Sequence, residues 1–310
     1  MRIVYMGTPD IAVPTLRFLA ESKHEVVGVL TQPDRPKGRG HHTIPTPVKA
    51  AALEYDIPVY QPLSLRKGED AAAALETLRQ LAPDLIVVLA YGQILPKEVL
   101  ELPKYRCINL HASLLPAYRG AAPIQWVILN GETKTGVTAQ QMAEGLDTGD
   151  MLLTYETKVG EKETAGELFD RLAQSGAELL TQTLVKLDEI EPRPQDDAQS
   201  CYAHMLDKQM AVIDWSKSAH EIDCLIRGLN PWPVALTTLS GERLKVFAAE
   251  KANGNGEPGT VLEADPKKGL TVACGEGALK LIEIQLVGGK RMKATDFLRG
   301  HVIEVGTKLN

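Results

Sequence analysis

The chain has 310 residues, of which 44% are hydrophobic and 24% charged, as in a globular protein of about two domains. Its formal net charge of −6 argues against a protein that coats nucleic acid non-specifically. No stretch approaches 18 consecutive apolar residues, so we expect no membrane span. The segment Met1 to Gly7 lacks the features of a signal or transit peptide, and we expect a cytoplasmic protein.

Four cysteines are spread along the chain without a CxxC pair, at Cys107, Cys201, Cys224 and Cys274. This spacing predicts neither a disulfide framework nor a structural zinc site, and it fits a reducing compartment.

Charge is distributed unevenly. From Lys208 to the end, 14 Lys and Arg stand against 12 Asp and Glu, whereas residues 1–207 hold 20 against 28. The difference is either chance variation or a sign that the C-terminal part contacts a polyanion.

The first half of the chain alternates short apolar runs with helical patterns. This alternation predicts an α/β fold with a doubly wound, mostly parallel sheet. The predicted strands are Ile3–Met6, Val26–Leu30, Leu85–Leu89, Cys107–His111, Thr135–Gln141 and Met151–Tyr155. Helices are predicted after a Thr8 cap with Pro9 in the first position, over Pro45–Tyr55, over Asp70–Leu81, and from a Thr164–Glu167 capping box to near Asp188.

The last hundred residues have a different pattern. After a helix that opens at a Ser218–Glu221 capping box, five short strands are predicted: Ala235–Leu239, Leu244–Ala249, Thr260–Glu263, Leu270–Cys274 and Leu279–Leu286. They predict a small C-terminal β-barrel of the oligonucleotide-binding type. We therefore divide the chain into a catalytic domain (1–188), an extended polar linker (189–207) and a barrel domain (208–310).

The densest polar segment follows a predicted central strand. Asn109 and His111 are two residues apart on that strand, so both side chains point to one face. Ligands of open parallel sheets bind outside this end of the strands. The two side chains could aim an amide and an imidazole at one atom, or they could only make local hydrogen bonds.

A second segment, Glu144 to Asp150, places glycines on either side of Asp147. Glycine lets the backbone turn sharply and approach a ligand closely. Alone, the segment would indicate a plain turn. It lacks the ligand spacing of an EF-hand loop, so we expect no metal there.

Together the two segments resemble a known family. The run Asn109-x-His111-x-Ser113-Leu114-Leu115-Pro116, with Asp147 downstream, is similar to the signature of the 10-formyltetrahydrofolate-dependent formyltransferases. Further matching segments are Gly7–Asp10, Thr31–Pro36, Gly38–Gly40, Arg119–Gln125, Gly145–Asp150, Gly228–Pro233 and Asp296–Gly300. The similarity covers nearly the whole chain and is greatest to members that formylate the α-amino group of the initiator methionyl-tRNA. Ile11, where an aromatic residue often occurs, is the one departure we note.

The resemblance implies roles for particular residues. Asn109, His111 and Asp147 would be the catalytic trio, and 10-formyltetrahydrofolate would be the formyl donor, with no metal. Ser113, Leu114, Leu115 and Pro116 would form part of the folate site, with the pterin pocket lined by Ala90, Tyr91, Gly92, Ile94, Met142 and Gly145. The barrel and the loop Asp34–Thr43 would contact tRNA, and no obligate protein partner is implied.

Formyl transfer to an amine suits these side chains. Attack of the amine on the formyl carbon creates an oxyanion, which donors already in place can stabilise. Asn109 and His111 offer N–H groups. Asp147 could set the imidazole tautomer, favour its charged form and relay a proton from the amine toward N10 of the folate.

Two basic segments are candidate tRNA contacts. Arg35, Lys37 and Arg39 lie in the loop after the second strand, and Lys290, Arg291 and Lys293 lie near the end of the chain. Each segment either binds phosphates or bases, or is an ordinary solvated loop.

Other functions fit less well. Only Gly7 follows the first strand where a dinucleotide-binding GxGxxG loop would stand, and no GxSxG element supports a serine hydrolase using Ser113. A non-catalytic RNA-binding module would leave the Asn109–Asp147 segment unexplained. The serious alternative is another folate-dependent amine formyltransferase, of amino-sugar or purine pathways, or a formyltetrahydrofolate hydrolase. The amine formyltransferases would share the trio without needing the basic loop together with the barrel, and the hydrolase would replace the amine with water.

Overall fold

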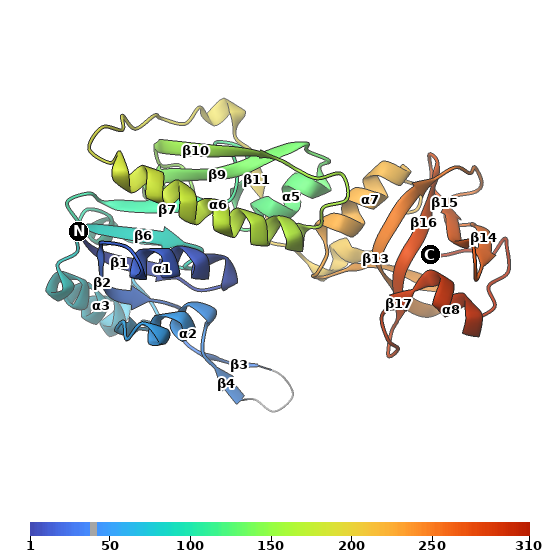
Figure 1. Cartoon of the computed structure of the whole chain (residues 1–310), viewed down its shortest axis with the longest axis horizontal. Coiled ribbons are helices and arrows are strands. Elements are labelled where there is room, and N and C mark those ends of the chain that lie inside the picture. The colour runs from blue at the N-terminus through green and yellow to red at the C-terminus, as the bar shows by residue number, and fades with distance from the viewer. Residues whose placement is uncertain (38–41) are drawn as a thin grey trace. The chain divides into compact units, whose positions relative to one another are not determined.

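A computed structural model of the chain describes residues 1–37 and 42–310 (Figure 1). Its larger sheet has the strand order β10-β9-β7-β6-β1-β2-β5. The bounds are β1 (Arg2–Gly7), β2 (Glu25–Leu30), β5 (Val59–Tyr60), β6 (Leu85–Leu89), β7 (Cys107–His111), β9 (Lys134–Gln141) and β10 (Met151–Lys158). Pairing is parallel from β5 to β7 and antiparallel between β7 and β9. The predicted mostly parallel sheet is confirmed.

The helices follow the predicted pattern with shifted ends. They are α1 (Val13–Ala20), α2 (Pro47–Glu54), α3 (Gly68–Leu81), α4 (Lys97–Leu100), α5 (Pro123–Leu129), α6 (Ala165–Val185), α7 (Ala219–Gly228) and α8 (Ala294–Gly300). Short 3-10 turns are η1 (Asp10–Ala12), η2 (Asp197–Gln199) and η3 (Lys208–Ala211). In the described part of the chain, no helix combines the length and the apolar character that a membrane crossing requires.

Two of the three predicted N-terminal helix caps are correct. The Thr164 and Ser218 hydroxyls accept the backbone N–H of Glu167 and Glu221, whose carboxylates reach back, so both capping boxes form. The prediction for Thr8 is wrong. Its hydroxyl donates instead to the Tyr91 carbonyl, at 2.9 Å, so it ties two strand ends together rather than capping a helix.

The central strands are buried along their whole length. All residues of β6 and β7 are buried, because helices cover both faces of a parallel sheet. Toward the edge, β9 and β10 approach closely at Gly136. A Cβ on that glycine would lie 1.9 Å from the Tyr155 carbonyl oxygen, so only glycine fits there.

The C-terminal residues form a separate antiparallel sheet, as predicted. Its order is β12-β13-β16-β15-β14, with β17 beside β16. The bounds are β12 (Ala235–Leu239), β13 (Glu242–Ala252), β14 (Val261–Asp265), β15 (Gly269–Ala273), β16 (Ala278–Leu286) and β17 (Met292–Lys293). The chain end bridges Leu309 to Leu239 and Lys308 to Thr260. The tail therefore joins the two edges of the sheet, as a small barrel requires.

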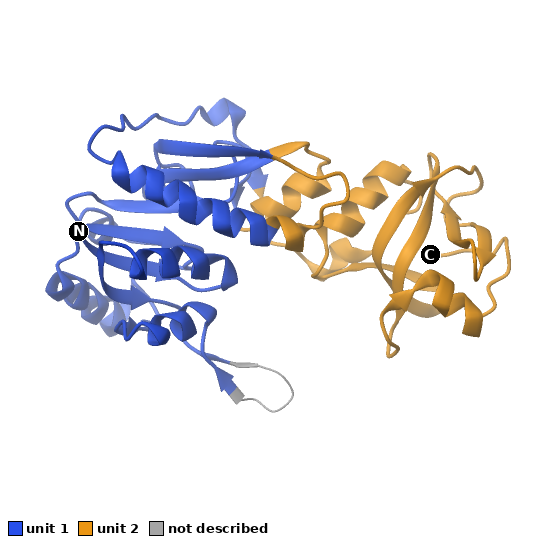
Figure 2. Cartoon of the chain, in the orientation of Figure 1, with its two compact units in different colours: residues 1–120, 135–157, 169–202 blue, residues 121–134, 158–168, 203–310 orange. Residues whose placement is uncertain are grey.

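The described residues group into two compact units that are not continuous in sequence (Figure 2). Unit 1 holds residues 1–120, 135–157 and 169–202, and unit 2 holds residues 121–134, 158–168 and 203–310. The domain division at 188 and 208 stays a prediction. The segment 189–207 is more ordered than a free linker, since it contains η2 and β11 (Tyr202–Ala203), which pairs with β8 (Arg119–Gly120).

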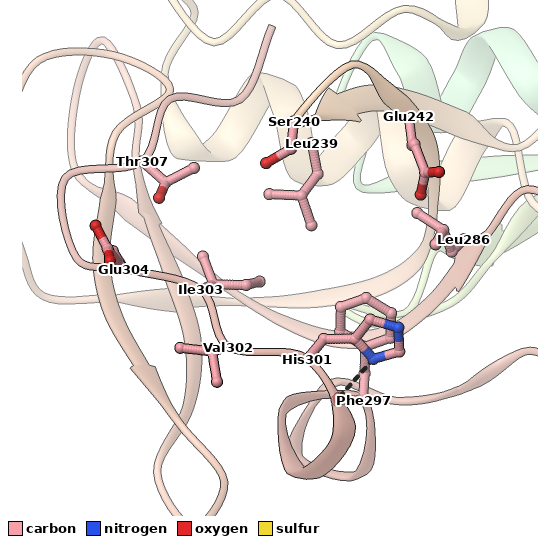
Figure 3. A pocket seen from close by; sticks show the side chains of 10 residues that line it. All are labelled: Leu239, Ser240, Glu242, Leu286, Phe297, His301, Val302, Ile303, Glu304 and Thr307. Carbon is pink, nitrogen blue, oxygen red and sulfur yellow. Dashed lines mark hydrogen bonds between the residues drawn. The ribbon is translucent and has the colours of Figure 1, made fainter.

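Unit 2 contains a cavity of about 510 Å³ beside α8 (Figure 3). Leu239, Leu286 and Ile303 contribute apolar lining. The His301 ring stacks on the Phe297 ring with 4.0 Å between ring centroids. The two rings that line the cavity therefore pack against each other.

Candidate active site

Asn109 and His111 lie at the carboxyl end of β7, the strand between β6 and β9. Their residues are only 8% and 6% exposed. Gln140 on β9 is the direct antiparallel partner of Asn109, so their side chains share one face of the sheet. Within residues 1–37 and 42–310, no hydrogen bond engages the Asn109 side-chain amide. A nearly buried amide of this kind is suited to bind a ligand, because a buried N–H donor without a hydrogen-bond partner destabilises the fold.

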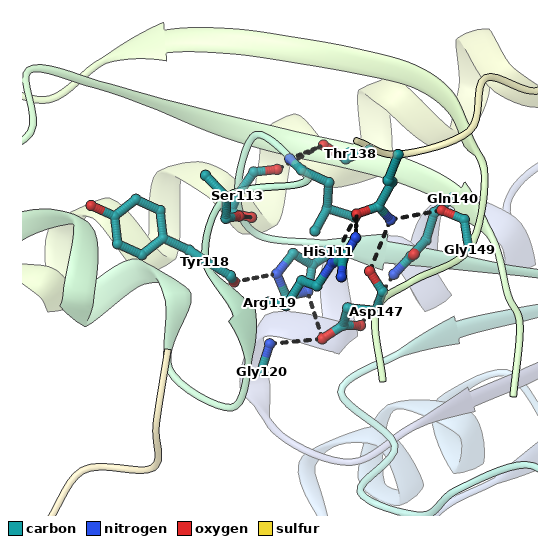
Figure 4. Close-up of polar contacts among 12 residues, drawn as sticks. His111, Ser113, Tyr118, Arg119, Gly120, Thr138, Gln140, Asp147 and Gly149 are labelled. Atoms are coloured by element: carbon teal, nitrogen blue, oxygen red, sulfur yellow. Dashed lines mark hydrogen bonds and ion pairs between the residues drawn. The ribbon is translucent and has the colours of Figure 1, made fainter. Parts of the chain in front are cut away.

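The His111 ring is held by a backbone group. Its Nε2 lies 2.8 Å from the Tyr118 carbonyl oxygen (Figure 4). A carbonyl only accepts, so Nε2 carries the proton. Nδ1 faces Asp147 Oδ2 at 3.6 Å, which is too long for a hydrogen bond. The Tyr118 carbonyl therefore sets the tautomer of the ring. The predicted role of Asp147 in setting the tautomer is wrong. Nδ1 can donate a hydrogen bond only when the ring is charged.

Both oxygens of the Asp147 carboxylate are fixed. Oδ2 accepts the Gly120 N–H at 2.9 Å, and Oδ1 accepts from Gln140 Nε2 at 3.1 Å (Figure 4). The side chain is 12% exposed. Asp147 has a positive φ of 52°, a left-handed conformation that asparagine and aspartate tolerate better than most residues. The carboxylate is thus pointed at His111 by groups from β8 and β9.

A second layer of contacts holds the turn that carries Asp147. Gln195 Nε2 donates to the Asp147 carbonyl at 2.8 Å and to the Gly149 carbonyl at 2.7 Å. Gln195 Oε1 accepts from Arg119 Nε and Nη2 at 3.0 and 2.8 Å. Sequence reasoning missed Gln195, because it stands in a polar run interpreted as linker. The sequence feature that could have indicated it was its partner Arg119, which lies in the matched segment Arg119–Gln125.

The Ser113–Pro116 segment is largely engaged with itself. Ser113 is fully buried, and its hydroxyl donates to the Ala117 carbonyl at 2.6 Å. Thr138 Oγ1 donates to the Ser113 carbonyl and accepts the Leu115 N–H. Ser113 and Leu115 therefore shape this loop, while Leu114 and Pro116 are partly exposed. Folate contact by the four residues stays a prediction.

A cavity of about 730 Å³ opens at the ends of β1, β2 and β6 in unit 1. Ala90, Tyr91 and Gly92 line it, as do Thr8 and Gln32, both of which donate to the Tyr91 carbonyl. Burial raises the pKa of the Tyr91 hydroxyl well above its usual range, so this group is neutral.

The other predicted pterin contacts are dispersed. Met142 packs against the same hydrophobic cluster as Tyr91. Ile94 is 55% exposed and does not belong to the described lining of the cavity. Gly145 is also exposed. The structure thus groups Ala90, Tyr91 and Gly92 at one cavity without bringing Ile94 or Gly145 into its wall.

The predicted basic contacts divide into two groups. Arg35 is exposed at the start of β3 (Arg35–Lys37), which pairs with β4 (His42–Ile44). Arg39 and the side chain of Lys37 lie outside the described residues. Lys290 and Lys293 are exposed in unit 2. Arg291 is also exposed but pairs with Glu283 and lies over the Phe247 ring, so its charge is partly engaged within the chain.

The base of the β3–β4 ribbon is anchored by Asp34. Its carboxylate accepts hydrogen bonds from Lys49 Nζ and Gln61 Nε2. These two hydrogen bonds lower the pKa of Asp34 below its usual range, and the bond from Lys49 has the larger effect. Of the residues that the structure describes, no group of three or more His, Cys, Asp or Glu could hold a metal ion.

Comparison with known proteins identifies the class. The formyl transferase family model matches residues 1–184, and the model of the formyl transferase C-terminal domain matches residues 205–302. The chain belongs to the formyl transferase family.

Several full-length relatives within this family share one name. A methionyl-tRNA formyltransferase of Clostridium novyi (strain NT) is 55% identical over 313 residues, with both chains covered completely. One from Citrifermentans bemidjiense is 53% identical and covers 99% of this chain and 95% of its own length. A solved N-formyltransferase from Helicobacter canadensis, in complex with folinic acid and dTDP-3-aminofucose, has a TM-score of 0.68 at 18% identity. It covers 94% of this chain and 100% of its own, and the likeness at that identity concerns the fold alone.

Proposed function

We propose that the chain transfers a formyl group from 10-formyltetrahydrofolate to the α-amino group of methionyl-initiator-tRNA. The observation that carries this proposal is the arrangement of Asn109, His111 and Asp147 at the carboxyl edge of the sheet. Among the described residues, an amide without a hydrogen-bond partner, an imidazole with one nitrogen left for a ligand and a fixed carboxylate lie together there. Full-length relatives at 51–55% identity carry the matching name, which supports the tRNA acceptor.

We assign Asn109 and His111 to the oxyanion. The amine nitrogen bonds to the formyl carbon, and the carbonyl electron pair moves onto oxygen. Asn109 Nδ2 and the Nδ1–H of charged His111 donate to that oxygen. Because Nε2 is committed to Tyr118, the ring must be an imidazolium to donate, and the Asp147 carboxylate 3.6 Å away stabilises that charge.

We assign the proton transfer to Asp147. The carboxylate accepts a proton from the attacking ammonium nitrogen, directly or through water. That proton goes to N10 of the folate as the bond between N10 and the formyl carbon breaks. The products are the N-formylated amine and tetrahydrofolate, and Asp147 ends ionised as it began.

We assign the folate and the tRNA to separate groups of residues. The cavity lined by Ala90, Tyr91 and Gly92 supports a pterin site, with Leu114 and Pro116 as further contacts. Arg35, Lys290 and Lys293 are exposed cations that could contact tRNA phosphates.

Label transfer tests the function. Purified protein is given 10-formyltetrahydrofolate labelled in the formyl carbon, with methionyl-initiator-tRNA, an amino-sugar nucleotide, glycinamide ribonucleotide or buffer alone. We expect label on methionyl-tRNA, at a rate at least ~100-fold above the other amines. Label on a sugar or purine precursor, or release as formate without any amine, would overturn the proposal.

A further inference from the structure

The segment between the predicted domains contains one residue unlike its neighbours. Residues 191–194 and 196–199 are exposed, whereas Gln195 is half-buried. Gln195 belongs to the same compact unit as Asp147 and Arg119. A half-buried amide in an otherwise solvated run indicates that its side chain has a specific partner.

All the strong hydrogen-bonding directions of this amide are used. The two N–H groups of Nε2 reach the carbonyls of Asp147 and Gly149, and Oε1 accepts twice from the Arg119 guanidinium. Arg119 itself is only 12% exposed and pairs with Asp197. Since a guanidinium only donates and a carbonyl only accepts, the amide has one possible orientation.

The two carbonyls that Gln195 binds belong to the turn that aims Asp147. Asp147 has a positive φ, a conformation that persists where the surrounding structure enforces it. Gly149 lies tightly against β9, because a Cβ there would be 1.9 Å from the Gln141 carbonyl oxygen. The turn is therefore fixed on the β9 side by packing and on the other side by Gln195.

We propose that Gln195 is a positioning residue for the Asp147 carboxylate, with Arg119 holding Gln195 in turn. This inference rests on the proposed function of Asp147. Gln195 does not touch the reacting atoms in this assignment. It fixes the backbone from which the carboxylate reaches the amine proton, and a displacement of about 1 Å there can cost up to 100-fold in rate.

Gln195→Glu isolates the part played by Nε2. The variant has nearly the same shape, and its remaining oxygen still accepts from Arg119. The second oxygen now faces the carbonyls of Asp147 and Gly149, where a donor is needed. The matched control is Gln199→Glu, because Gln199 is exposed and, within the part of the chain that the structure describes, its amide donates only to Asp196 in its own turn.

The experiment is a double-mutant cycle with the full-length protein in the methionyl-tRNA assay. Gln195→Glu should lower kcat by roughly 10-fold or more and change the KM for both substrates by less than about 3-fold. In an Asp147→Asn background, Gln195→Glu should lower kcat by less than about 2-fold, because its effect on the rate depends on the Asp147 carboxylate. Gln199→Glu should behave as wild type in both backgrounds.

The outcomes separate this inference from the proposed function. A strong loss in Asp147→Asn with unchanged kcat in Gln195→Glu overturns the positioning role alone. An equal loss from Gln195→Glu in both backgrounds, with a lower Tm, also overturns it, since that is the result of a purely structural role. Near-wild-type turnover by Asp147→Asn overturns both the role of Asp147 and the role of Gln195.

Discussion

At the scale of single residues, backbone groups orient the candidate site as much as side chains do. The carbonyl of Tyr118 fixes the His111 ring, and the N–H of Gly120 fixes the Asp147 carboxylate. Side-chain patterns in the sequence could indicate Asn109, His111 and Asp147. They could not indicate these partners, because every residue has a carbonyl and nearly every residue has an N–H.

Asp147→Asn should therefore separate chemistry from folding. The amide keeps the volume of the side chain but loses the negative charge beside His111 and the proton acceptor. We expect kcat/KM to fall at least 100-fold, which is about 2.7 kcal/mol of transition-state stabilisation. Steady-state kinetics measure the loss, and the Tm should stay within a few degrees of wild type. Turnover close to wild type in a folded variant would rule out the proposed proton transfer.

The four cysteines should differ sharply in reactivity. Burial raises the pKa of Cys107 to about 12 and that of Cys274 to about 11, and burial also raises the pKa of Cys224. Because a raised pKa keeps the thiol protonated, the reactive thiolate of Cys107 is on the order of 10⁻⁴ of the total at pH 8. Cys201 is exposed. We expect iodoacetamide to label Cys201 first in the native protein, as followed by mass spectrometry. Labelling of Cys107 at a similar rate without denaturant would contradict the buried environment.

At the scale of helices and strands, the sequence was most informative where one segment determines its own structure. Cys107–His111 and Leu85–Leu89 were predicted with the bounds that β7 and β6 have, because short apolar runs between turn residues are typical of buried strands. The end of α6 was wrong by about a turn, since it stops at Val185 and not near Asp188. The pairing of β8 with β11 was missed, because each strand is two residues long and has no periodicity to detect.

Close approach of β9 and β10 gives a test at this scale. Gly136→Ala would place a Cβ 1.9 Å from the Tyr155 carbonyl oxygen and 2.7 Å from a Leu114 methyl. The backbone must shift, and we expect a loss of ~1–3 kcal/mol in the free energy of unfolding, measured with urea. Gly300→Ala is the matched control, because apart from its chain neighbours and the backbone of α8 no described atom lies within 4 Å of the position that its new Cβ would occupy, and its φ is not positive. Equal stability of the two variants would contradict the close contact.

At the scale of the whole molecule, sequence order and compact units differ. The family models match residues 1–184 and residues 205–302. Yet α5, from the first matched region, belongs to unit 2, where it contacts α7. Hydrophobic patterns could show that α5 has an apolar face, but they could not show that its partner lies about a hundred residues further along the chain.

A cut after residue 207 should therefore destabilise the first part of the chain. Pro123, Ile124, Val127 and Ile128 of α5 are buried, and Gly228 of α7 lies directly against Leu129. Exposing a buried Ile or Val costs about 1.5–3 kcal/mol each, so loss of α7 should cost several kcal/mol. We expect the fragment 1–207 to melt well below the full chain and to bind a hydrophobic dye.

The matched control for this cut is the full chain opened by a protease site placed after residue 207, with both pieces kept together. Its α7 still covers α5, so we expect a Tm within a few degrees of the intact chain and little dye binding. This comparison separates loss of the apolar contact from loss of chain continuity, because both samples are cut at the same bond. A fragment 1–207 that melts with the intact chain would show that α5 needs no cover from α7, and the two units would then be separable at the predicted linker.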